Sequence, residues 1–447
     1  MKDAGGSVVI HGHFYQPPRE NPWTGLVDAE ASAAPDHDWN ARITRECYAP
    51  LVSIAVPDGG RELCIPAYEY LSCDFGPTLL DWMEREAPAM YDAVLQADRA
   101  SAARLGHGNA LAMPYHHIIF PLASRRDKVT EVRWGLDDFR RRFGRDPAGF
   151  WLPETAVDRE SLEVLAEAGI AFTVLAPHQV HPAPAHGLPG RVELARGRSI
   201  AVCIYDGGLS HAVAFGNFLT DPDRFTAALD HTARGAVAAI AVDGETFGHH
   251  HAGGDRTLGT VLHRLRSGGR VTITNFAAVL AARPPVEPVE LITPTSWSCA
   301  HGVERWRAAC GCRVHHDRPS QQDWRAPLRA AVDWLAREVH ALYERDGAHL
   351  PGGPWAFRDA AGGAGPVPGA DAEAAPRLVE MERGVLRAMT SCGWFFDDIR
   401  GIEGRQVLRY AAHAMALAGP ERGRLEAGFL DQLGDARSHV FREVARP

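Results

Sequence analysis

The sequence predicts an α/β fold, with an incomplete, seven-stranded β/α barrel of the TIM-like kind over residues 1–280 and a mostly helical C-terminal domain over 281–447. Short apolar runs alternate with segments of helical periodicity, which favours parallel strands covered by helices. Polar side chains gather where the apolar runs end, as they do at one face of such a barrel. The Pro-rich segment 281–289 lacks periodicity and separates this alternating pattern from a mostly helical one.

Seven strands are expected before residue 250, because that many short apolar runs alternate there with helical segments. The strands are centred near residues 8, 63, 111, 150, 173, 202 and 239, and a short further strand is expected at 271–274. Helices are expected between them at 76–95, 127–143, 161–168, 223–233 and 256–265. An open doubly wound sheet is the competing architecture, but its phosphate-binding glycine pattern is missing.

Beyond residue 289 the periodicity predicts helices at 324–343, 378–390 and 406–417. A stretch rich in Gly, Ala and Pro at 360–375 predicts a loop between the first two of them. We expect this helical domain to contribute to the same cleft as the barrel.

The composition excludes several function classes. The chain of 447 residues has a net charge of −9, so electrostatics gives it no reason to bind nucleic acid or an anionic membrane. A mildly acidic protein is compatible with a neutral partner such as a sugar. No apolar run approaches the ~20 residues of a membrane span, and none near the N-terminus resembles a secretory signal. With eight cysteines and no such signal, we expect reduced thiols and a cytoplasmic location.

The first predicted strand, at residues 7–10, leads into His11 and His13. Positions i and i+2 of an extended backbone lie on the same side of the strand. This pair could share a metal ion, hydrogen-bond sugar hydroxyls or a carboxylate, or simply pack in the core. The long segment 19–60 that follows is rich in Pro, Ala, Asp and Gly, and surface excursions of this length tend to be functional.

Two buried strands end abruptly in acidic residues. The apolar run 149–152 stops at a proline followed by Glu154, and the run 238–242 leads directly into Asp243 and then Glu245. A glycosidase needs one carboxylate to attack the sugar and one carboxylic acid to protonate the leaving oxygen. Each acid taken alone could instead cap a helix or lie in a solvated turn.

Aromatic and histidine side chains accompany these strand ends. His249 follows Asp243 closely enough to line the same cleft, although it could also lie in a polar loop. Indole rings pack well against the apolar face of a pyranose, while most tryptophans in a protein belong to its core. The candidate sugar platforms are Trp151, Trp297, Trp306 and Trp394.

Four soft ligands occur within fourteen residues. Cys299, His301, Cys310 and Cys312 form a C-x-H-x8-C-x-C set that could hold structural zinc. The spacing matches no standard zinc ribbon, so the sequence favours packed, reduced thiols over a metal site.

The motifs together resemble glycoside hydrolase family 57, in the subgroup with an additional helical C-terminal region. Residues 11–17, with their histidine pair and Gln-Pro, are similar to that family's first motif, and residues 108–109 to its second. Residues 150–154 and 243–249 resemble the third and fourth motifs. Residues 390–396 are similar to the fifth, although Cys392 and Gly393 depart from its usual Ser-Asp-Trp-Pro-Phe pattern.

The resemblance covers nearly the whole chain and implies a seven-stranded barrel, α-glucan substrates, a retaining mechanism and no metal or cofactor in the chemistry. It implies that Glu154 is the nucleophile and Asp243 the acid/base. Family members include α-amylases, 4-α-glucanotransferases and branching enzymes. The residues expected to bind substrate are His11, His13, Asn109, His117, Trp151, Glu245, His249, Trp297, Trp306 and Trp394.

Two other hypotheses remain open at this point. A non-catalytic glucan-binding or regulatory protein could use the same scaffold. A metal-dependent carbohydrate deacetylase could be built from His11, His13 and Asp243. The double-displacement hypothesis requires the carboxyl groups of Glu154 and Asp243 to converge to ~5–6 Å.

Overall fold

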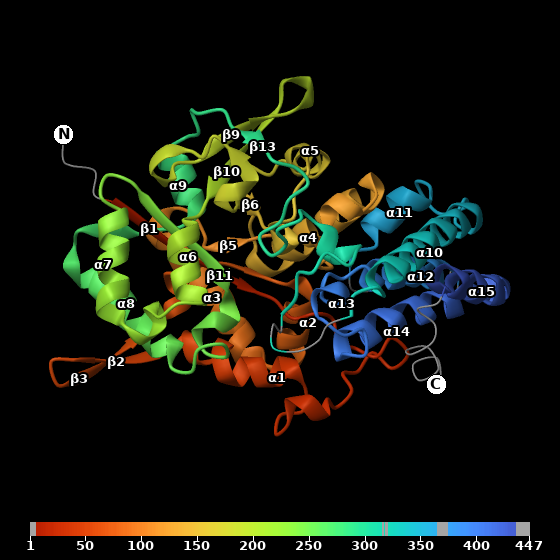
Figure 1. Ribbon diagram of the computed structural model, residues 1–447, viewed down its shortest axis with the longest axis horizontal. Helices are drawn as coiled ribbons and strands as arrows, with labels where there is room; N and C mark the ends of the chain where they lie inside the picture. Colours follow the sequence, from red (N-terminus) through yellow and green to blue (C-terminus); the bar gives the residue numbers. More distant parts are fainter. Residues whose placement is uncertain (1–5, 315–316, 318–320, 364–373, 435–447) are drawn as a thin grey trace.

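A computed structural model describes residues 6–314, 317, 321–363 and 374–434 (Figure 1). Seven parallel strands surround a common core, as the sequence predicts. In chain order they are β1 (Gly6–Phe14), β4 (Ser72–Phe75), β5 (Ala110–Leu111), β6 (Gly149–Phe150), β7 (Phe172–Leu175), β10 (Ser199–Ile204) and β11 (Val237–Asp243).

These strands form an incomplete barrel. One sheet has the order β11-β1-β4-β5 and a second contains β6-β7-β10. A parallel bridge between Ala112 and Phe150 joins the sheets on one side. On the other side, β10 and β11 are linked by the hydrogen bond from Asp206 N to Ala239 O (2.7 Å) rather than by a ladder. The predicted fold class is therefore confirmed.

The second barrel strand is not where the sequence predicts it. The strand expected near residue 63 is β3 (Arg61–Ile65), which pairs antiparallel with β2 (Ile54–Asp58) in a hairpin. The barrel instead uses β4, whose four residues are all buried. Its sequence, Ser-Cys-Asp-Phe, lacks an apolar run because Ser72 and Asp74 are buried polar groups with partners inside the barrel. Local hydrophobicity could not reveal such a strand.

Helices cover the outside of the barrel. The helix expected at 76–95 is two helices, because Ala87 leaves the helical conformation and Pro88 starts the next helix. The covering helices are α1 (Trp39–Ile43), α2 (Pro77–Glu86), α3 (Pro88–Leu105), α4 (Arg125–Phe143), α5 (Arg159–Glu167), α6 (Gly207–Ala214), α7 (Pro222–Thr232), α8 (Gly254–Gly268) and α9 (Phe276–Ala282). The smaller strands are β8 (Val180–His181), β9 (Gly190–Glu193), β12 (Val271–Ile273) and β13 (Glu290–Leu291).

The C-terminal helices lie together on one side of the barrel (Figure 1). They are α10 (Arg325–Asp346), α11 (Pro354–Ala360), α12 (Ala374–Ala388), α13 (Cys392–Phe395), α14 (Ile402–Leu417) and α15 (Arg422–Leu433). A continuous hydrophobic core runs from the barrel into these helices. Most of the loop expected at 360–375 lies outside the described residues.

A buried ion network also ties α11 and α12 to the barrel helix α4. Arg358 donates to Asp127 on α4 (3.0 Å) and to Glu382 on α12 (2.5 Å).

No helix in the described part of the chain combines the length and the apolar character that a membrane crossing requires.

Candidate active site

Glu154 lies at the end of β6 in a strained turn. Its backbone is left-handed (φ 58°, ψ 19°), and so is that of Thr155 (φ 47°). Such conformations cost about 1–3 kcal/mol each for residues other than glycine, so the surroundings must enforce them. The buried side chain of Gln179 does so: it accepts a hydrogen bond from Thr155 Oγ1 (2.9 Å) and donates one to Thr155 O (2.8 Å).

Two side chains from a distant loop hold the Glu154 carboxylate. Trp297 Nε1 (3.0 Å) and Ser298 Oγ (2.6 Å) both donate to Glu154 Oε2. The backbone N–H of Trp297 also donates to Glu154 O (3.0 Å). Burial raises the pKa of Glu154 and so does the charge of Asp243, whereas the bonds from Ser298 and Trp297 act in the opposite direction. Ser298 carries no motif in the sequence and was not predicted.

Asp243 ends β11 and keeps an exposed side chain. Among the described residues, no side-chain hydrogen bond to its carboxyl group is formed. Protein atoms around it remove much of the bulk water, and this desolvation raises its pKa; the positive charge of His13 opposes the shift, and the charge of Asp74 adds to it.

Three neighbouring strands present a row of charged groups. In the barrel register His13 on β1 pairs with Asp243 on β11 and with Asp74 on β4. The Asp74 carboxylate is fully buried and binds both histidines, His11 Nε2 at 3.0 Å and His13 Nδ1 at 2.7 Å. His11 Nδ1 also lies 3.1 Å from Ser72 Oγ. Asp74 was not predicted as a site residue, because its strand β4 lacks an apolar run and was not predicted either.

The two histidines differ in charge. Burial opposes protonation of His13, but the charges of Asp74, Asp243 and Glu245 outweigh it and raise its pKa to about 9. Burial lowers the pKa of His11 despite its bond to Asp74. A cationic His13 and a neutral His11 thus flank one carboxylate. Both ring nitrogens of His11 are already engaged, so the geometry does not favour the metal-sharing alternative.

Glu245, two residues after Asp243, is buried. It contacts the segment 19–60 through Tyr48 and the loop after β1 through Gln16. Its Oε1 accepts hydrogen bonds from Gln16 Nε2 (3.2 Å) and from the Tyr48 hydroxyl. Burial raises its pKa to about 7, and the charge of Asp243 contributes in the same direction. Glu245 therefore links the end of β11 to the excursion 19–60, whose functional role stays a prediction.

Aromatic rings form the floor. Trp151 stacks on His11 (4.7 Å between ring centroids) and on His13 (5.2 Å), and Trp297 meets Trp151 edge-on at 5.2 Å. Trp151 is fully buried, so it supports the histidines and does not offer a face to a sugar. Trp297 stays partly exposed beside Glu154, so its ring could still contact a sugar.

His117 connects the barrel to the C-terminal helices. Its ring stacks on Tyr15 at 3.9 Å, and its Nδ1 lies 2.6 Å from Ser391 Oγ, in the segment that resembles the fifth motif. Its Nε2 is buried and has no hydrogen-bond partner among the described residues. The ring belongs to the same stack as His13, at 5.3 Å.

Four expected substrate-binding residues lie elsewhere. Trp306 and Trp394 are completely buried in the C-terminal core, so their prediction as sugar platforms is wrong. Asn109 is also buried and bonds Tyr68 O (3.0 Å) and Asn275 (3.0 Å), so it links the segments before β4 and α9. His249 binds Glu46 (2.6 Å). None of the four contacts Glu154 or Asp243.

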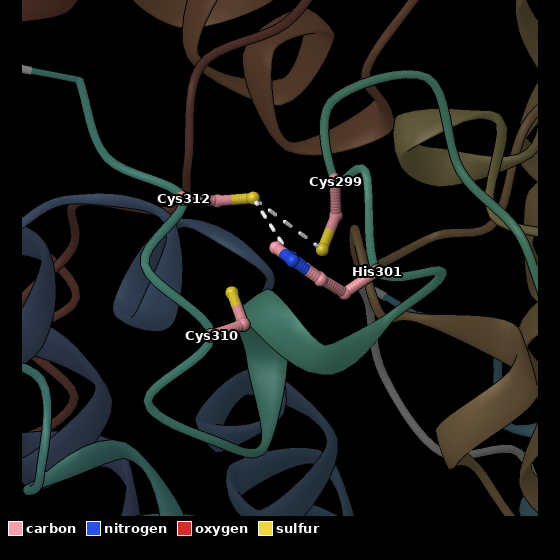
Figure 2. A group of neighbouring side chains, drawn as sticks. All are labelled: Cys299, His301, Cys310 and Cys312. Carbon is pink, nitrogen blue, oxygen red and sulfur yellow. Dashed lines mark hydrogen bonds between the residues drawn. The ribbon is translucent and has the colours of Figure 1, made fainter.

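Figure 2 shows the side chains of Cys299, His301, Cys310 and Cys312 pointing toward one another. Their ligand atoms all lie within 4.8 Å of one another, and within the described ranges they are the group of His, Cys and acidic residues suited to hold a metal ion.

Comparisons with known proteins agree with this architecture. A family model described as Glycosyl hydrolase family 57 matches residues 93–283, and one described as Domain of unknown function (DUF3536) matches residues 321–362 and 366–444. Alpha-amylase 1 of Dictyoglomus thermophilum is 26% identical over 106 residues, which are 24% of this chain and 15% of that relative. The match thus spans less than two thirds of that relative's length.

Solved structures share the fold over nearly the whole chain. An exo-type maltose-forming amylase from Pyrococcus sp. ST04 has a TM-score of 0.70 at 16% identity, covering 95% of this chain and 83% of that one. A GH57 branching enzyme from Thermococcus kodakaraensis has a TM-score of 0.65 at 16% identity, covering 98% and 95%. A 4-alpha-glucanotransferase from Thermococcus litoralis has 0.58 at 16%, covering 92% and 59%. The barrel segment 93–283 thus matches the model of glycoside hydrolase family 57, and nearly the whole chain shares its fold with these solved structures.

Proposed function

We propose that this protein is a retaining enzyme that cleaves or transfers α-glucan chains by double displacement, with Glu154 as nucleophile and Asp243 as acid/base. One observation carries the proposal: the carboxyl groups at the ends of β6 and β11 act on each other's charge but have different environments. Burial raises the pKa of both groups, but Glu154 accepts two hydrogen bonds that favour its charged form, whereas the charge of Asp74 adds to the desolvation of Asp243. Such a separation of acid and nucleophile is the pattern of glycosidases.

In the first step the Glu154 carboxylate attacks the anomeric carbon while the glycosidic C–O bond breaks. Asp243 gives its proton to the departing oxygen, and a covalent glycosyl ester forms. In the second step the Asp243 carboxylate takes a proton from the acceptor. The acceptor oxygen attacks the same carbon and releases Glu154, so the anomeric configuration is retained.

The surrounding side chains are assigned supporting roles. His13 is cationic and faces Asp74, Asp243 and Glu245, so it balances their charges while a sugar displaces water. Trp297 positions both Glu154 and, through its partly exposed ring, a sugar face. The relatives named as amylases, glucanotransferase and branching enzyme support α-glucans as the substrate class.

The full chain should be incubated with maltooligosaccharides and with amylose. Reducing ends, chain redistribution and new branch points would be measured together, so that water and sugar acceptors are distinguished. NMR of the first product formed should show the α-anomer. Tight oligosaccharide binding without any product would favour a binding protein and overturn the proposal.

The variant Glu154→Ala should lose turnover by at least about 10⁴-fold and regain part of it with azide, which replaces the missing nucleophile. The matched control is Glu193→Gln, an exposed position on β9. Full activity in Glu154→Ala would remove Glu154 from the mechanism.

A further inference from the structure

We propose that Cys299, His301, Cys310 and Cys312 bind one structural Zn²⁺ ion, which fixes the loop that carries Trp297 and Ser298. The four side chains converge from two short segments of a loop with little regular secondary structure (Figure 2). Three thiolates and one imidazole are a ligand set of structural zinc sites.

The distances between the ligand atoms fit a tetrahedron around zinc. Zn–S bonds of about 2.3 Å and a Zn–N bond of about 2.0–2.1 Å place two sulfurs about 3.8 Å apart, and a sulfur and a nitrogen about 3.5 Å apart. Cys312 Sγ lies 3.8 Å from Cys299 Sγ and 3.5 Å from His301 Nδ1. All four ligand atoms lie within 4.8 Å of one another. The site therefore needs little rearrangement to take the ion.

Two buried arginines beside the cluster supply a matching charge. Arg325 donates to Cys312 O (3.2 Å) and Phe396 O (3.4 Å), and Arg305 donates to Phe395 O (3.0 Å) and Ser298 O (3.1 Å). Both guanidinium groups are buried, and these bonds go to carbonyl oxygens rather than to carboxylates. Buried cations need a nearby negative charge. Zinc held by three thiolates and a neutral imidazole carries a net negative charge, which would add to those of Asp397 near Arg325 and Glu154 near Arg305.

The segment with the last two ligands is already positioned for binding. Gln322 Nε2 donates to Cys312 O (2.9 Å), and Gln322 Oε1 accepts from Gly311 N (3.0 Å). Bonds of this kind around the ligands orient them and are part of a metal site. The proposal departs from the preference for packed thiols that the sequence spacing gave, because spacing in the chain does not report the distances that the fold creates.

The four protein ligands complete a tetrahedron, so the ion has no open position and is structural rather than catalytic. Its consequence for Glu154 rests on the proposed function. Cys299 directly follows Trp297 and Ser298, which hold the Glu154 carboxylate. Arg305 further connects Ser298 to Phe395, next to the segment that contacts His117. The ion would thus fix the donors of the nucleophile.

The full chain should be purified under reducing conditions without chelator, and its zinc measured by mass spectrometry. We expect about one zinc ion per chain. Exchange for Co²⁺ should give the visible absorption of a tetrahedral cobalt-thiolate site. A reduced protein that binds neither ion, or a disulfide between Cys299 and Cys312, would overturn the proposal.

Cys310→Ser and Cys312→Ser should lose the bound zinc and lower the Tm, whereas the exposed control Cys64→Ser on β3 should keep both. Cys312→His should retain zinc, because imidazole can replace a thiolate as ligand. Unchanged zinc content in both serine variants would contradict the assignment. If a serine variant does not fold, the cobalt spectrum of the unaltered chain still decides.

Zinc binding and catalysis can fail separately in these experiments. Glu154→Ala should retain its zinc, and the zinc content is read without any substrate. An inactive wild-type protein with one zinc ion would refute the proposed function alone, and an active protein without zinc would refute the site alone.

Discussion

The two acid-bearing strand ends resemble each other in sequence but differ in how the fold surrounds them. Glu154 at the end of β6 lies in a strained backbone turn and accepts hydrogen bonds from a loop 144 residues away. Asp243 at the end of β11 continues a regular strand and lies beside a histidine–carboxylate row. Burial raises the pKa of both carboxyl groups, but hydrogen bonds that favour the anion oppose this shift at the first, whereas no side-chain hydrogen bond among the described residues holds the second. Role assignment therefore depends on what surrounds each acid.

The largest effect that would sharpen this contrast comes from Asp243→Ala. Removal of the acid should reduce turnover of unactivated α-glucans by about 10²–10⁴-fold. An α-glucoside with a good leaving group, such as a nitrophenol, needs no proton for departure, so its glycosylation step should be much less affected. Glu154→Ala should lose activity on both substrates. Equal losses for both variants on both substrates, measured by steady-state kinetics, would break the contrast.

Ser298→Ala removes one of the two hydrogen bonds to the Glu154 carboxylate. A hydrogen bond to a charged group contributes about 1.5–3 kcal/mol, so kcat/KM should fall roughly 10–100-fold. The pKa of Glu154 should rise further, and the acidic limb of the pH–activity profile should move to higher pH. Ser296→Ala, whose hydroxyl bonds Gly302 O instead, is the control. An acidic limb that stays in place would exclude this role for Ser298.

His13→Gln tests the other strand end. His13 remains protonated up to a pKa of about 9, and its positive charge lowers the pKa of Asp243. Removal of this charge should raise the pKa of Asp243. The basic limb, where the general acid loses its proton, should move to higher pH by roughly one unit or more. A shift to lower pH, measured as kcat/KM against pH, would contradict this arrangement of charges.

The free energy of unfolding of the wild-type protein should also depend on the protonation of His13. Since the folded-state pKa of His13 is raised from 6.5 to about 9, its contribution to folding is fully present below pH 6.5 and is lost as the pH rises through 9. The Tm of His13→Gln should lack this part of the decline.

The smallest effect on activity is expected for Trp306→Phe. This ring is buried in the C-terminal core, so the change should lower the free energy of unfolding by about 1–3 kcal/mol and leave kcat/KM within about twofold at temperatures below the Tm. Trp297→Phe, which deletes the indole N–H that Glu154 accepts, should instead reduce kcat/KM. Comparison of thermal unfolding with kinetics separates the two tryptophans. A large decrease of kcat/KM in Trp306→Phe would indicate that Trp306 does belong to the active site.

The sequence by itself determined the alternation of strands and helices, except around β4, and both candidate carboxyl groups. Apolar strands that stop at acidic residues are local patterns, and they identified β6, β11, Glu154 and Asp243 without reference to the rest of the chain. The same local reasoning failed for β4, because burial of Asp74 is tolerable only with His11 and His13 as partners from another strand.

Only the tertiary structure decided which groups act on those two acids. Ser298 and Trp297 reach Glu154, Asp74 reaches His13, and two pairs of zinc-type ligands meet, through contacts between segments distant in sequence or set by loop geometry. Trp306 and Trp394 show the converse, since nothing in a single tryptophan distinguishes a sugar platform from a core residue. Strand ends follow from hydrophobic pattern, whereas hydrogen-bond partners and desolvation follow from distances that exist only in the folded chain.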